Sequence, residues 1–177
     1  MNTFSTGDTV QIVLNDLKDT FCGCKRIGGS INVRFPLAQA DSVSLSEDNF
    51  TFLYHVEEVG GSVAFFNVPP IDRLTLPRLV LIRGNGIAPG GAALTLENST
   101  VDEFVLPKLV EISNGNVQLS NTTWCGYYTV NWNDILEAGE VRLLPNDEDL
   151  NFADELNMRC LSANRECAYV LSWGHVV

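Results

Sequence analysis

A pattern that recurs along the chain constrains its fold more than any other feature of the sequence. In each copy, three apolar residues stand three positions apart and a glycine follows them. The copies are Phe21, Cys24, Ile27 and Gly29; Leu53, Val56, Val59 and Gly61; Leu76, Leu79, Ile82 and Gly84; and Leu106, Leu109, Ile112 and Gly115. They begin 32, 23 and about 30 residues apart, a spacing that is typical of solenoid coils.

A short segment with alternating apolar residues follows each glycine. The four segments begin near Ile31, Val63, Leu94 and Val117. Alternation with period two and β-branched residues is typical of half-buried strands. The glycine before each strand supplies a bend that other residues resist. We therefore expect a repeated coil whose strands lie parallel and stack over one continuous core.

Three asparagines share a position in this repeat. Asn67, Asn98 and Asn121 each stand four residues after the first inward residue of their strand. In a solenoid, asparagines stacked in this way can hydrogen-bond one another at a turn. The alternative is that they are three ordinary turn asparagines.

The ends of a solenoid need covers, because they expose core and unpaired strand edge. Helical spacing predicts a helix at one end, from Val10, Leu14, Leu17 and Phe21. The residues Trp132, Ile135 and Leu136 before Gly139 predict a short helix near the other end. The segment from Pro145 to Asn157 is acidic and irregular, and we expect it to be a loop.

The composition argues against several classes of function. The net charge of −11 makes the chain a poor ligand for nucleic acid, whose phosphates need clustered Lys and Arg. No apolar run approaches the roughly 20 residues of a membrane span, and residues 1–9 are too polar for a signal peptide. We therefore expect no direct insertion of this chain into a membrane.

We find no motif that predicts catalysis, a cofactor or a metal. The five cysteines match no zinc spacing, and the histidines His55 and His175 are isolated. The glycine-rich segment 84–91 lacks the Gly-Lys-Ser/Thr of a phosphate loop. No serine or cysteine stands in a nucleophile motif. The sequence therefore predicts no catalytic residues, no cofactor and no metal ligands.

Five segments of the chain carry a family resemblance. They are Cys24 to Ile31, Phe52 to Gly61, Leu79 to Asn85, Leu106 to Val117, and Cys125 followed by Trp132. In this order they resemble the receptor L domain of the epidermal-growth-factor-receptor and insulin-receptor families, over roughly residues 10 to 160. The Ile-Arg-Gly run at 82–84 and the Glu-Ile-Ser run at 111–113 favour the epidermal-growth-factor-receptor branch.

The resemblance implies a mostly β fold, a right-handed parallel β-helix with a short capping helix at each end. It places the L domain at residues 10–158 and a truncated start of a cysteine-rich, furin-like region at 159–177. Residues 1–9 are then a disordered or non-native N-terminus. The family closes its last coil with a disulfide, which here implies a bond between Cys125 and Cys160. Cys24 shares the inward phase of the repeat, so we expect it to be buried.

The resemblance also implies a function, the binding of growth factors outside the cell by a receptor tyrosine kinase ectodomain. The implied partners are a protein ligand of epidermal-growth-factor type and a second receptor in a dimer. The alternatives are a secreted stand-alone L-domain protein that acts as a decoy, or a structural solenoid without ligand. This chain would be a fragment of the parent protein, whose kinase domain it lacks.

In the family, the ligand lies against the sheet of stacked strands. The residues that face outward there are Asn32, Arg34, Ala64, Phe66, Thr95, Glu97 and Gln118. Sequons at Asn49, Asn98 and Asn121 predict glycosylation. We expect Asn49 to be the best site, since an inward asparagine ladder would hide the other two from a glycan.

Overall fold

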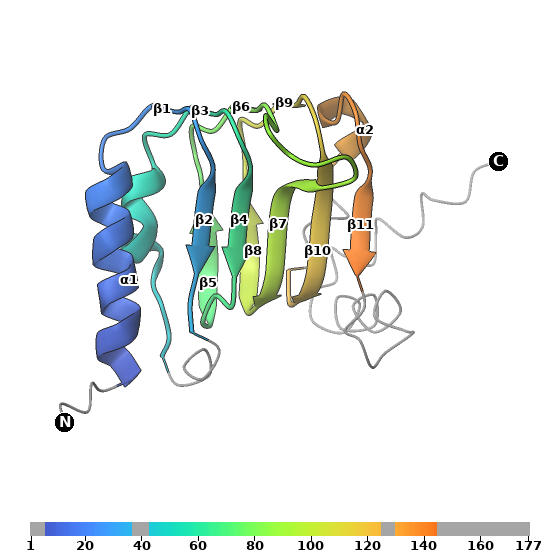
Figure 1. Ribbon diagram of the computed structural model, residues 1–177. Helices are drawn as coiled ribbons and strands as arrows, with labels where there is room; N and C mark the ends of the chain where they lie inside the picture. Colours follow the sequence, from blue (N-terminus) through green and yellow to red (C-terminus); the bar gives the residue numbers. More distant parts are fainter. Residues whose placement is uncertain (1–5, 37–42, 125–129, 145–177) are drawn as a thin grey trace.

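The computed structural model describes residues 6–36, 43–124 and 130–144, and the chain in these ranges is mostly β (Figure 1). Its helices are α1 (Thr6–Phe21), the 3-10 helix η2 (Glu47–Leu53) and α2 (Trp132–Ile135). The remaining elements are strands that form three sheets. The described residues do not include Cys125, Cys160 or the segment from Pro145 to Asn157. The predicted disulfide and the predicted loop therefore stay predictions.

Every strand pair in the three sheets is parallel. The first sheet has the order β1 (Arg26–Ile27), β3 (Glu58–Val59), β6 (Leu81–Ile82) and β9 (Glu111–Ile112). The second has the order β11 (Val141–Leu144), β10 (Asn116–Thr122), β7 (Ala92–Ser99), β4 (Val63–Phe66) and β2 (Ile31–Arg34). The third pairs β5 (Ile71–Thr75) with β8 (Val101–Val105). The chain visits these sheets in turn, so the predicted stacking of parallel strands is confirmed.

The alternation in the five-stranded sheet divides core from surface as expected. The inward residues of β2, β4, β7 and β10 stand in register across the strands and are fully buried, as Ile31, Val63, Leu94 and Val117 are in one row. Phe65 and its neighbours in the next inward row are also 0% exposed. The strand phase read from the sequence is therefore correct.

A chain of aromatic rings runs through the core from one coil to the next. Phe65 lies edge-on to Phe50, with ring centroids 6.3 Å apart, and to Phe104, at 5.7 Å. The contacts continue from Phe104 to Trp124 at 5.4 Å and from Trp124 to Trp132 at 6.4 Å. Edge-to-face pairs at these distances add to the free energy of folding beyond what the burial of their apolar area contributes. The rings therefore join the coils into one core.

The asparagines Asn67, Asn98 and Asn121 mark a left-handed turn at the end of three strands. Their φ angles are 55°, 48° and 43°, a conformation that asparagine tolerates better than most residues. Asn121 Nδ2 donates to Asn98 Oδ1 over 3.0 Å, which confirms stacking for this pair. Asn67 Nδ2 donates instead to the carbonyl of Phe35 over 2.8 Å, because the preceding coil has no asparagine at that position.

Helices lie at both ends of the row of strands, as the sequence predicts (Figure 1). Val10 and Leu14 of α1 are buried, and α1 begins at Thr6, within the segment 1–9 that was expected to be disordered. At the other end, Leu136 directly follows α2 and forms a parallel bridge with Ile112, so it extends the four-stranded sheet. No helix among the described residues is long and apolar enough to cross a membrane.

Cys24 departs from the expected burial. It is half-buried, and its Sγ lies 3.9 Å from the carbonyl oxygen of Thr20. It follows Gly23, whose φ of 76° ends α1 with a left-handed turn. The expectation of a buried Cys24 is therefore wrong, because the first copy of the repeat lies at the end of the stack and at a helix terminus.

Candidate functional site

The outward residues of the five-stranded sheet form two rows across its strands. The first row contains Asn32, Ala64, Thr95, Gln118 and Arg142, which are paired in register. The second contains Arg34, Phe66, Glu97 and Ser120. All seven residues that the sequence places on the ligand side lie in these rows. We call this surface the outer face.

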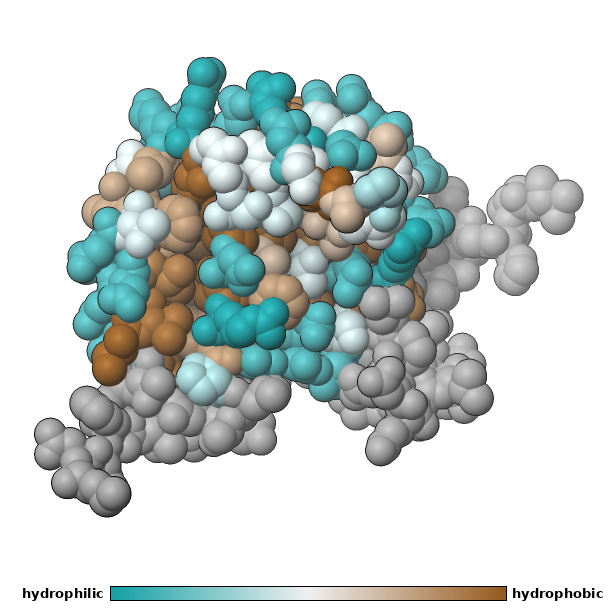
Figure 2. Space-filling model, viewed as in Figure 1, coloured by the Kyte–Doolittle hydropathy of each residue, from teal (hydrophilic) through white to brown (hydrophobic). Residues whose placement is uncertain are grey.

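Exposure differs strongly within the outer face. Asn32 and Arg34 are exposed, and Phe66, Glu97 and Gln118 are half-buried. Ala64 and Thr95 have short side chains and are only 7% and 6% exposed. Figure 2 shows polar side chains over the middle of this view and hydrophobic surface gathered toward α1. The long side chains of the face are thus available for contact, whereas those of Ala64 and Thr95 are not.

Phe66 is in contact with Arg34 on the outer face. The guanidinium carbon of Arg34 lies over its ring, 3.9 Å from the centroid. Arg34 and Phe66 are paired in register on the neighbouring strands β2 and β4. Such a cation–π contact stabilises by about 0.5–1 kcal/mol at an exposed site. The two side chains therefore form one unit on the outer face.

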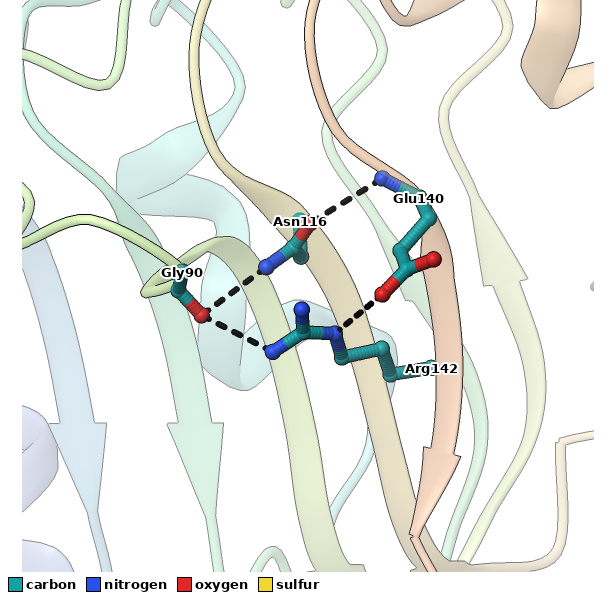
Figure 3. Close-up of polar contacts among 4 residues, drawn as sticks. All are labelled: Gly90, Asn116, Glu140 and Arg142. Atoms are coloured by element: carbon teal, nitrogen blue, oxygen red, sulfur yellow. Dashed lines mark hydrogen bonds and ion pairs between the residues drawn. The ribbon is translucent and has the colours of Figure 1, made fainter.

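The loop 83–91 crosses the far end of the outer face and is fixed there. The carbonyl of Gly90 accepts hydrogen bonds from Asn116 Nδ2 over 2.9 Å and from an Arg142 terminal nitrogen over 3.0 Å (Figure 3). Arg142 Nε also donates to Glu140 Oε1 over 2.7 Å, and the Glu140 amide donates to Asn116 Oδ1 over 3.0 Å. The loop therefore packs against the outer face at Asn116, where β10 begins, and at Arg142 of β11.

Sequence reasoning missed the roles of Asn116, Glu140 and Arg142. One signal for the loop was available: ten positions separate Gly84 from Leu94, whereas two separate the glycine from the strand in the other copies. The insertion had to pack somewhere. No pattern in the sequence pairs it with Arg142, which is 52 residues from Gly90.

The charged groups of the outer face fall into two classes. Arg142 is paired with Glu140, whereas Arg34 and Glu97 have no ion pair within residues 6–36, 43–124 and 130–144. Outside the outer face, a hydrogen bond from Arg83 lowers the pKa of Glu58, and burial raises the pKa of Tyr54 to about 12. Among the described residues, no group of three or more His, Cys, Asp or Glu could hold a metal ion.

The three sequons differ in their surroundings. Asn49 is half-buried, and its Oδ1 accepts hydrogen bonds from the amide and the hydroxyl of Ser46 over 2.8 and 3.1 Å. Asn98 is half-buried as well, whereas Asn121 is exposed although it belongs to the ladder. The ladder therefore does not hide Asn121, which was the reason for ranking Asn49 above it.

Comparison with known proteins agrees with this architecture. A family model described as "Receptor L domain" matches residues 23–136. The chain is 28% identical to the epidermal growth factor receptor of Gallus gallus over 169 residues, which cover 91% of this chain and 23% of that protein. It is 24% identical to the receptor tyrosine-protein kinase erbB-4 of Homo sapiens over 173 residues, which cover 94% of this chain and 13% of that protein. The chain thus spans less than a quarter of these relatives.

Proposed function

Because this chain belongs to the receptor L domain family, we propose that it is the growth-factor-binding module of a receptor tyrosine kinase ectodomain of the epidermal-growth-factor-receptor type. The relatives support this proposal, since one is a receptor for epidermal growth factor and the other a receptor tyrosine kinase. In this proposal the chain acts outside the cell, and a kinase domain elsewhere in the parent protein carries the catalytic activity.

One observation carries the assignment of the site to the outer face. The Arg34 and Phe66 side chains stand together on a polar sheet surface, where no described helix covers the strands β2, β4 and β7 (Figure 1). Aromatic and arginine side chains are the most frequent energetic centres of protein interfaces. We infer that Phe66 and Arg34 are the centre of the ligand contact, with Asn32, Glu97 and Gln118 around them.

Binding of chicken epidermal growth factor to the immobilised full chain tests this function. Truncation of a central aromatic contact costs about 2 kcal/mol or more, so Phe66→Ala should lower the affinity about thirty-fold. Val110→Ala is the matched control, because Val110 is 62% exposed and lies next to β9, which belongs to a different sheet from the outer face. Equal affinity of wild type and Phe66→Ala would remove Phe66 from the site, and absence of binding to the wild type would refute this ligand class.

The wider organisation follows from the same proposal. The coil is a right-handed parallel β-helix, in which the three parallel sheets are its faces and α1 and α2 its caps. The L domain covers residues 10–158 together with the helical start of α1, and the segment 159–177 begins a cysteine-rich region. A bond between Cys125 and Cys160 closes the last coil, and a second receptor is the dimer partner. Asn49, Asn98 and Asn121 are the proposed glycosylation sites.

A further inference from the structure

The chemistry of Arg34 specifies more than a contact point. Its guanidinium lies over the ring of Phe66, 3.9 Å from the centroid. Among the described residues it has no ion pair, although four other arginines are paired with a glutamate there, namely Arg26, Arg73, Arg83 and Arg142. A guanidinium that stacks on an aromatic face keeps its N–H donors free at its edge. Arg34 therefore presents a fork of donors to solvent.

This fork is ordered before a partner arrives. Stacking on Phe66 restricts a side chain that is otherwise rich in rotamers, so less conformational entropy is lost when the guanidinium forms hydrogen bonds. The planar fork of arginine matches a carboxylate with two parallel hydrogen bonds. A carboxylate that approaches Arg34 from solvent would thus meet a preorganised site rather than a mobile surface cation.

The neighbouring charge narrows the class of partner. Glu97 stands in the same outward row as Arg34, with Phe66 between them. Two strand spacings correspond to about 10 Å between these positions. Glu97 also has no ion pair among the described residues. A polyanion such as a sulfated polysaccharide would meet repulsion at Glu97, whereas a protein surface can present both signs.

We propose that the stacked Arg34 binds a side-chain carboxylate of the protein ligand, and that Glu97 binds a basic side chain about 10 Å away on the same ligand. This inference rests on the proposed function and adds the order of charges along the ligand surface. The Phe66 ring has two roles in it, since it supports the guanidinium and separates the two charged contacts. The ligand is therefore recognised by an acidic and a basic residue in a fixed order across the strands.

A small-molecule titration tests the carboxylate site without any growth factor. The Nε–Hε signals of Arg34 and Arg78 are followed by NMR in the full chain at neutral pH, while N-acetylglutamate amide is added. Arg78 is the internal control, because it is exposed and has neither an aromatic partner nor an ion pair in the described part of the chain. We expect a dissociation constant about threefold lower at Arg34 than at Arg78, and no difference in Phe66→Leu. Equal affinities in the wild type, or tighter binding of inorganic phosphate than of the carboxylate at Arg34, would overturn the proposal.

Charge reversal tests the order of charges with the protein ligand. Arg34→Glu should weaken the binding of chicken epidermal growth factor about tenfold or more, and Arg34→Lys should weaken it less. Glu97→Gln should also weaken binding, with a smaller dependence on salt concentration than in the wild type. Melting curves identify variants that fail to fold. If the wild type binds and Arg34→Glu binds equally well, Arg34 does not bind a carboxylate of the ligand. If the wild type itself does not bind, the proposed function fails, while the titration still decides on the carboxylate site.

Discussion

Two adjacent phenylalanines allow a sharp test of the strand phase. Phe65 is 0% exposed and lies edge-on to Phe50 and Phe104, whereas Phe66 is half-buried and faces outward under Arg34. Both residues belong to β4, so substitutions at the two positions change the same strand by the same chemistry. Only the side of the sheet differs.

The expected losses of stability differ several-fold. Phe65→Ala removes a fully buried ring, which costs about 3–5 kcal/mol including the cavity that it leaves. Its two edge-to-face contacts contribute about 0.5–1.5 kcal/mol each within that range. Phe66→Ala removes a half-buried ring and one cation–π contact, which contributes about 0.5–1 kcal/mol at an exposed site. Since a domain is stable by only about 5–15 kcal/mol, the first variant should be close to unfolding.

Urea denaturation followed by tryptophan fluorescence measures both variants. Trp124 and Trp132 lie in the same aromatic chain as Phe65, so their emission reports on the core. We expect the midpoint to fall strongly for Phe65→Ala and slightly for Phe66→Ala, at an unchanged slope. The midpoint of Phe65→Leu should lie between those of the two alanine variants, because leucine retains most of the apolar volume. Equal midpoints for the two alanine variants, or a larger loss in Phe66→Ala, would refute the assigned phase.

Three further predictions follow from the coil corners, the loop and the ion pairs. Gly84→Ala should destabilise far more than Gly86→Ala in thermal melts: both have positive φ, but only at Gly84 would the new methyl group collide with the next coil. Arg142→Ala should speed amide exchange and protease cleavage in the loop 83–91, with a small change in melting temperature, because the Gly90 carbonyl loses one of its two donors. Arg83 lowers the pKa of Glu58 below its ordinary 4.5, so the ionised carboxylate stabilises the fold above pH 4.5, and this stabilisation is lost as the pH falls through the lower folded-state pKa. The difference in free energy of unfolding between wild type and Glu58→Gln should therefore vanish in acid.

The sequence was informative where side-chain period alone decides the structure. Strands begin at Ile31, Val63 and near Leu94 and Val117 because alternate apolar residues can be buried only on one side of a sheet. The outer face follows from the same alternation. Half-buried Cys24 shows where this logic ends, since an end coil has a neighbour on one side only.

Contacts between distant segments could not be predicted in the same way. The hydrogen bond from Arg142 to Gly90 depends on how a loop folds back over two strands. The charged residues near Arg142 and Gly90 in the sequence do not predict this contact. The stacking of Arg34 on Phe66 required the register between β2 and β4. Both residues were correctly placed on the outward side, but their direct contact depends on which side chains the register makes neighbours.

The two outward rows also bear on how such a protein can change during evolution. They form a grid with a pitch of about 4.8 Å between strands and roughly 6.7 Å along each strand, held by backbone hydrogen bonds that are indifferent to the outward side chain. A substitution at one grid point alters the chemistry presented there and leaves the inward neighbours, such as Val63 and Phe65, untouched. Duplicated copies of such a gene could therefore acquire new binding preferences one position at a time, without a period in which the fold itself is compromised.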